Sequence, residues 1–138
     1  MEKSDFERLV QENLSVGNGS KTNLTGRLKA VADGEQIDLP LWNIVKGVSW
    51  IIMFGSGHDI FENGIILVVE ERNFGQELGP GSALISYKEE GGETYSWVEG
   101  KLMVSHDAVG NRYYGGGSAK MMSGSPVVNI ENMIFDFV

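Results

Sequence analysis

Residues 26–41 read GRLKAVADGEQIDLPL, and this stretch decides the fold class. Apolar residues occupy every second position from Leu28 to Ala32, and again from Ile37 to Leu41 after the Asp33-Gly34 pair. A period of two is typical of a strand with one buried face. Asp-Gly between two such strands predicts a tight hairpin, because both central positions of a type I′ turn need positive φ. Pro40 favours a sheet edge, since proline has no N–H to donate.

The same pattern continues through the rest of the chain. Nineteen glycines in 138 residues separate short runs of β-branched and aromatic residues, and apolar residues alternate again from Met133 to Phe137 at the end. We count eight or nine short strands. They predict a mostly β, antiparallel sandwich or jelly roll, with a closed β-barrel as the alternative.

The N-terminal segment has a different period. Ser4 and Glu7 have the spacing of a capping box, which predicts the start of a helix. One apolar face follows at intervals of three and four residues, and it is the candidate interface: Phe6, Leu9, Val10 and Leu14. We therefore expect a short amphipathic helix and a connector in residues 1–23, and a single β domain in residues 24–138.

Two central stretches, residues 44–54 and 60–71, have apolar residues at both odd and even positions, so both faces of each predicted strand are apolar. A strand that is apolar on both faces has to be covered on both faces. One cover is the opposite layer of the fold, and the other is either the N-terminal helix or a second subunit. A single-layer barrel of one copy would leave one of these faces in water, so we expect more apolar surface than one copy conceals.

Composition excludes several classes of partner and site. Nineteen Asp and Glu against eleven Lys and Arg give a net charge of −8, which repels nucleic-acid phosphates and predicts no nucleic-acid partner. The absence of cysteine excludes disulfides, thiol nucleophiles and thiolate metal sites. The charged opening is unlike a signal peptide, and the apolar runs are too short to cross a bilayer, so we expect a soluble, cytoplasmic protein without a membrane partner.

The two histidines occur in matching H-D-x-x-x-N motifs, at His58-Asp59 and at His106-Asp107. Imidazole and carboxylate groups suit a divalent cation or a proton transfer, and such a cation is the only cofactor these motifs suggest. The competing interpretation is turn chemistry, because Asp and Asn side chains bond nearby backbone amides in loops. We favour turn chemistry and expect no cofactor.

The positions of Tyr95 and Trp97 depend on the register of a hairpin. A three-residue loop at residues 90–92 turns both rings into the core, whereas two or four residues turn them to water, where they could stack on sugars. Before Gly100 both rings stand at odd positions, and beyond it the apolar alternation continues at even positions. A glycine bulge would cause this change if both rings already faced the core. The core placement is the better interpretation.

Tyr113 and Tyr114 precede three glycines, and adjacent strand residues point in opposite directions. At most one of the two rings is buried, so the other, together with Trp42, is a candidate ligand-binding ring. The glycines at residues 115–117 have little strand character, and we expect them to admit a ligand or another backbone at close range.

Catalytic motifs are missing. The glycine-rich segments lack the lysine and the strand-to-helix context of a phosphate loop, and no G-x-S-x-G is present. We therefore expect a protein that is not an enzyme.

Residues 26–34, GRLKAVADG, resemble the opening hairpin of small uncharacterised bacterial β-sandwich proteins that begin G-x-ϕ-x-A-x-x-D-G, where ϕ is apolar. Residues 129–137, NIENMIFDF, are similar to the final strand of those proteins. The resemblance implies a sandwich and no assigned activity.

The predicted function is binding of a protein partner or of its own copies, with a dimer as the simplest assembly. The alternative is a carbohydrate-binding module that uses Tyr114, Trp42 or the Tyr95–Trp97 pair. A third hypothesis, a membrane-active or toxin subunit, rests on the weakly charged residues 115–124.

Overall fold

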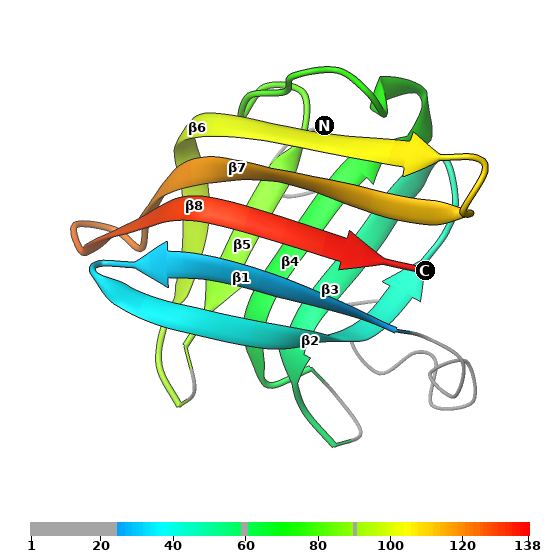
Figure 1. Cartoon of the computed structure of the whole chain (residues 1–138). Helices are drawn as coiled ribbons and strands as arrows, with labels where there is room; N and C mark the ends of the chain where they lie inside the picture. The colour runs from blue at the N-terminus through cyan, green and yellow to red at the C-terminus, as the bar shows by residue number, and fades with distance from the viewer. Residues whose placement is uncertain (1–24, 59–60, 90) are drawn as a thin grey trace.

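The computed structural model describes residues 25–58, 61–89 and 91–138. Their eight strands form a closed antiparallel barrel in which each strand pairs with the next along the chain and β1 pairs with β8 (Figure 1). The strands are β1 (Gly26–Ala32), β2 (Glu35–Val45), β3 (Ser49–Ser56), β4 (Asn63–Glu70), β5 (Leu84–Lys88), β6 (Thr94–Asp107), β7 (Arg112–Met122) and β8 (Val127–Phe137). The mostly β, antiparallel class is confirmed, and the arrangement is the barrel given as the alternative to a sandwich. The helix predicted in residues 1–23, with Phe6, Leu9, Val10 and Leu14, lies outside the described residues.

The first hairpin forms as predicted. Ala32 pairs with Glu35, and Asp33 and Gly34 make the turn with φ of 49° and 86°. The Asp33 carboxylate accepts a hydrogen bond of 2.9 Å from the amide of Asn129, and the Asp33 amide donates one of 2.9 Å to the Asn129 carbonyl. This turn therefore joins the hairpin to β8 as well as joining β1 to β2.

Closure explains why the sandwich expectation is wrong. The first and last strands pair along most of their lengths, from Gly26 with Phe137 to Ala32 with Ile130, so neither keeps a free edge. A local edge remains in β2, because its ladder to β3 begins only at Leu41. Pro40 lies just before that point, where its missing N–H costs no ladder hydrogen bond. Alternation shows which face of a strand is buried, but it does not show which strands are neighbours.

The connection between β4 and β5 completes the wall. It begins with a short 3-10 helix, η2 (Glu71–Asn73), and then runs beside the second half of β6. Leu78 and Leu102 exchange backbone hydrogen bonds of 2.7 and 2.9 Å, and the Gly75 amide donates to the Val104 carbonyl at 2.7 Å. This pairing matters because the β5–β6 ladder covers only three residue pairs.

Side chains fill the interior of the barrel, as expected for eight strands. Most strands send alternate residues inward, and the largest buried ones include Leu28, Phe54, Leu67, Leu102, Met121 and Phe137. The inner core therefore draws on residues from both ends of the chain.

A second apolar cluster lies on the outside of β3 and β4. The outward side chains Ile51, Met53, Ile66 and Val68 are only 1–3% exposed, although they point away from the inner core. Trp42 and Phe61 pack in the same cluster, edge to face, with ring centroids 5.6 Å apart. Both strands are thus buried on both faces, as predicted. The expectation that a barrel of one copy leaves this face in water is wrong.

The glycines of β7 belong to a continuous strand, which corrects the expectation that residues 115–117 have little strand character. A Cβ atom on Gly115 would lie 1.9 Å from the Met103 carbonyl oxygen, and one on Gly117 would lie 2.0 Å from that of Lys101. These glycines therefore allow β6 to approach β7 closely. We expected these glycines to admit either a ligand or another backbone, and in the structure they admit the backbone of β6.

We predict that Gly115→Ala lowers the free energy of unfolding by about 3 kcal/mol, because the new methyl group collides with β6 in a packed wall. Gly81→Ala is the matched control, since a Cβ atom added there would meet no atom within 4 Å and the φ of Gly81 is not positive. Urea unfolding followed by tryptophan fluorescence measures both variants. Equal stability of the two variants would contradict the close approach.

Candidate functional site

The two histidine motifs lie at opposite ends of the barrel. His58 follows β3, at the end that also carries the β1–β2 turn, whereas His106 and Asp107 end β6 at the end where β1 begins. Eight residues of strand span on the order of 25 Å, and metal ligands lie about 2 Å from their ion. The two motifs therefore cannot share one ion. Asp59 lies outside the described residues, and among those described no three His, Asp or Glu side chains are grouped to hold a metal.

His106 and Asp107 have local structural roles. The His106 imidazole stacks on the ring of its cross-strand partner Tyr113, with centroids 4.3 Å apart and planes 11° from parallel. The Asp107 carboxylate accepts hydrogen bonds from the amides of Val109 at 3.1 Å and Gly110 at 3.4 Å. At Asp107 the observed chemistry is the turn chemistry that we favoured.

Tyr113 belongs to an aromatic cluster at the same end of the barrel. Its half-buried ring stacks on Phe137 with centroids 5.1 Å apart, and it also contacts Trp50 at 5.0 Å and Phe74 at 5.9 Å. With His106 on one side and Phe137 on the other, both faces of the ring are occupied. Tyr113 therefore packs this end of the core and offers no free face to a ligand.

Three other candidate rings are buried. Trp42, Tyr95 and Trp97 are only 5–8% exposed, and the indoles of Trp42 and Trp97 donate to the backbone carbonyls of Gly57 and Glu99. Tyr95 and Trp97 point inward because the hairpin has the predicted three-residue loop, with Tyr87 opposite Tyr95. Of the five candidate rings, Tyr114 alone is well exposed.

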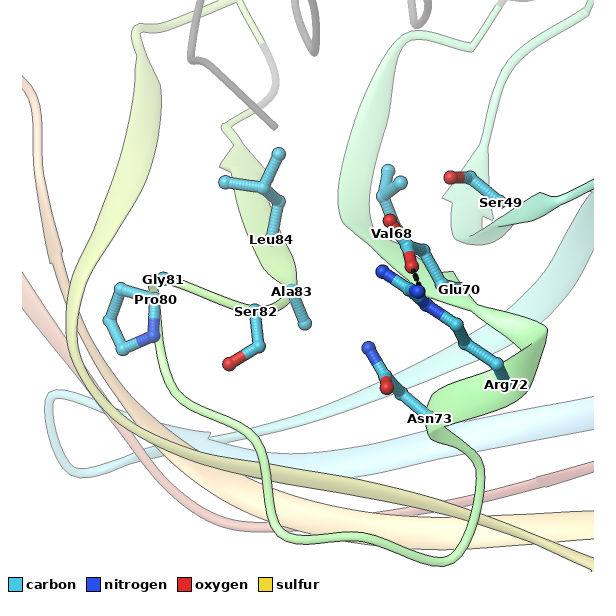
Figure 2. Close-up of a pocket in the computed structure, with 10 residues that line it drawn as sticks. All are labelled: Ser49, Val68, Glu70, Arg72, Asn73, Pro80, Gly81, Ser82, Ala83 and Leu84. Atoms are coloured by element: carbon cyan, nitrogen blue, oxygen red, sulfur yellow. Dashed lines mark hydrogen bonds and ion pairs between the residues drawn. The ribbon is translucent and has the colours of Figure 1, made fainter.

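A polar pocket of about 190 Å³ lies where β4 ends and β5 begins (Figure 2). Figure 2 shows Glu70, Arg72 and Asn73 on one side and the turn formed by residues 80–83 on the other. Arg72 donates from Nε to the Glu70 carboxylate at 2.5 Å, so the charge of the guanidinium is locally neutralised. The pocket offers hydroxyl, amide and carboxylate groups, and none of the described residues that line it has an aromatic ring on which a sugar could stack.

Exposed apolar side chains gather instead on the outer surface of β6, β7 and β8. Met103, Tyr114 and Ile134 are 38%, 48% and 61% exposed. Met103 and Ile134 flank Gly116 on its two neighbouring strands, and Tyr114 lies two residues before that glycine. We call this surface the Tyr114 face and define it by Met103, Tyr114 and Ile134 together with the bordering charges Arg27, Lys29, Asp38, Arg112 and Asp136. It lies over the strands nearest the viewer in Figure 1.

The Tyr114 face is uneven as well as apolar. A hollow of about 440 Å³ lies between Tyr114, Ile134 and the side chains of Arg27 and Arg112. A second hollow of about 420 Å³ lies on the β2 side, and Ile134 and Lys29 border both. Ile134 therefore stands as a ridge between two hollows.

The charge of this face differs from that of the whole chain. Arg27 pairs with Asp38 at 2.7 Å and Arg112 pairs with Asp136, while Lys29 makes no ion pair within the part of the chain that the structure describes. Three cations and two carboxylates leave one net positive charge here, although the chain carries −8. This face therefore lacks the net negative charge that repels acidic surfaces elsewhere on the chain.

Sequence reasoning identified Tyr114 but missed its neighbours. Ile134 stands at one of the alternate positions of the last strand that face water, so the sequence pattern could have identified it as an exposed apolar residue. Lys29 gave no signal, because it becomes a neighbour of Ile134 only when β1 pairs with β8. Of residues 115–124, on which the membrane-active hypothesis rests, residues 115–122 lie within β7, and β7 pairs with β6 on one side and β8 on the other.

Comparisons with family models, with curated proteins and with solved structures give no match for this chain. Among the described residues, no helix is long and apolar enough to span a bilayer. Function is therefore inferred from the geometry of the chain itself.

Tyr87 and Tyr95 form a cross-strand pair at the barrel end that carries the β3–β4 connection, with ring centroids 5.9 Å apart. A hydrogen bond to Glu89 is the main cause that raises the pKa of the Tyr95 phenol, and burial adds to it. Burial is the main cause that raises the pKa of Tyr87. Both phenols are thus held in the neutral form by the folded state.

We predict an alkaline loss of stability that depends on this pair. Because both folded pKa values lie above the ordinary value of 10.0, the unfolded chain loses these protons first. The stabilisation is complete below pH 10 and disappears as the pH rises toward the folded pKa values. Urea unfolding at increasing pH should show a shallower decline for Tyr95→Phe than for the native chain. Tyr114→Phe, which removes a phenol near the other end of the barrel, is the control, and equal declines in all three proteins would refute the prediction.

Proposed function

We propose that this protein is a non-enzymatic module that associates with a second copy of itself through the Tyr114 face. The observation that carries the proposal is the contiguity of three large, exposed apolar side chains, Met103, Tyr114 and Ile134, on one outer wall. Contiguous apolar surface on a folded protein commonly marks an interaction site, and tyrosine is frequent among the residues that dominate binding energy.

The exposed apolar surface lies on a different wall of the barrel from the one that the sequence indicated. Self-association was predicted from the outward faces of β3 and β4, but those side chains are already buried in a single chain. They supply no uncovered surface. The exposed apolar residues lie on β6, β7 and β8, across the barrel from β3 and β4.

Charge opposes a second copy less at this face than it does over the acidic remainder of the chain. Two chains that each carry −8 repel one another over most of their surfaces. The Tyr114 face carries one net positive charge, and its two carboxylates are already paired with arginines. Two copies that meet here bring together faces of only one net positive charge each, so the repulsion is weaker than between two strongly acidic surfaces.

Shape favours the same partner. In a two-fold assembly each copy offers the same patch, so a ridge on one copy has to meet a hollow on the other. Ile134 is such a ridge, and the hollow between Tyr114, Arg27 and Arg112 lies beside it. In the proposed dimer, Ile134 of each copy fills this hollow on its partner.

Carbohydrate binding has less support. Three of the four rings that this alternative would use are buried, and the ten residues drawn around the polar pocket in Figure 2 include no aromatic ring. Tyr114 is an isolated ring on a surface that is otherwise aliphatic and charged, which suits a protein partner better than a sugar.

We predict that Ile134→Lys weakens self-association at least ten-fold, or about 1.4 kcal/mol, because it removes the apolar ridge and puts an ammonium group into a hollow that Arg27 and Arg112 already border. Sedimentation velocity over a wide range of protein concentration gives the dissociation constant. Val127→Lys is the matched control, since Val127 lies near the other end of the same strand and is 39% exposed.

The outcomes separate clearly. Association of the native chain and of Val127→Lys, with loss in Ile134→Lys, supports the proposal. A native chain that stays monomeric at every concentration, or two variants that dissociate equally, contradicts it.

A further inference from the structure

We propose that the outer face of β3 and β4 is the docking site for the chain's own N-terminal segment, residues 6–14. This outer β3–β4 face is defined by Ile51, Met53, Ile66 and Val68. The inference does not depend on the Tyr114 face, which belongs to other strands.

The face is a compact apolar surface. Ile51 pairs with Val68 and Met53 pairs with Ile66, so the four side chains form two adjacent cross-strand pairs. All four point away from the inner core, yet they are only 1–3% exposed. Outward side chains of a single sheet reach such low exposure only under a second layer.

The described residues that pack against this face come from the elements beside it. Trp42 comes from β2 and Leu84 from β5, the strands that flank β3 and β4, and Phe61 comes from the β3–β4 connection. The Trp42 indole is fixed at its border by a hydrogen bond of 3.0 Å to the Gly57 carbonyl. Side chains from flanking strands reach the borders of the face, and we infer that a further segment of the chain covers its centre.

The N-terminal segment has the pattern that such a cover needs. Phe6, Leu9, Val10 and Leu14 recur at intervals of three and four residues, which gives one apolar stripe on a helix. A helix of about three turns is marginal in water by itself and gains stability from a surface on which its stripe packs. The sheet face needs a covering segment, and the apolar stripe needs a surface on which to pack. The two are therefore complementary.

The chain is long enough to reach the face. Thr25 accepts a hydrogen bond of 2.9 Å from Val138, so the described chain begins at the barrel end where β3 also begins. From β1 to β4 is three strand spacings, or roughly 15 Å. The ten residues 15–24 span up to roughly 35 Å when extended. An occupant from the same chain is also favoured because the face is buried in a single copy.

Paramagnetic relaxation in the full-length protein tests the proposal. The chain has no cysteine, so Arg8→Cys provides one attachment point for a nitroxide, on the helix side opposite the apolar stripe. We expect the nitroxide to broaden the methyl resonances of Ile51, Met53, Ile66 and Val68. A nitroxide at Val109→Cys is the control, because Val109 is 99% exposed in the β6–β7 turn, and it should leave these four resonances sharp.

A mixed sample identifies the occupant. Isotope-labelled chains without nitroxide are combined with nitroxide-bearing chains that carry no isotope, so that broadening reports only contacts between copies. Broadening in a chain that carries both the isotope and the nitroxide, with none in the mixture, supports docking within one chain. Equal broadening in the mixture assigns the face to a second copy, and no broadening in either sample leaves the segment away from the face; both results overturn the proposal.

A substitution in the segment gives a second readout. Leu9→Asp should increase the fluorescence of an apolar-surface dye several-fold by uncovering the outer β3–β4 face. Gln11→Asp, on the side of the helix away from the stripe, should leave the fluorescence at the native level. The same signal from both variants would contradict the docking.

Discussion

The pairing of β1 with β8 is the interaction on which the rest of the structure depends. It brings Leu28 opposite Phe135 and closes the wall around the inner core. The Asp33 turn strengthens the seam through its two hydrogen bonds to Asn129. Without this seam both strands would present open edges, which invite pairing with other chains, and the inner core would lose one side. The seam also creates the Tyr114 face, because Lys29 and Ile134 come from opposite ends of the sequence and meet only across it.

The closed barrel has two different walls. At β3 and β4 the strands are buried on both faces, so the wall is two apolar layers thick. At β7 and β8 the inner face is packed, but the outer face leaves Tyr114 and Ile134 in water. The contrast matters for function, since the thick wall has little apolar surface left to offer whereas the thin wall has exposed apolar surface without a net negative local charge. We therefore propose the thin wall, rather than the thick one, as the surface for association.

Local features of this fold could be predicted from the sequence, and relations between distant strands could not. The Asp33-Gly34 turn and the inward placement of Tyr95 and Trp97 followed from alternation and turn chemistry, and both are observed. Alternation carries no information about strand neighbours, so it could not distinguish a barrel from a sandwich. For the same reason it could not show that His58 and His106 lie at opposite ends, or that Met103, Gly116 and Ile134 form one row. Glycines 115–117 were misread because their strand role depends on the close approach of β6.

The closure of the barrel is tested most directly by NMR, through amide exchange and cross-strand nuclear Overhauser effects between β1 and β8. A closed barrel predicts contacts between the backbones of Leu28 and Phe135 and of Lys29 and Ile134, with slow exchange for the amides that bond across the seam. Rapid exchange along the β8-facing side of β1, with no contacts between the two strands, would show an open edge. That result would contradict both the barrel and the surface assembled across its seam.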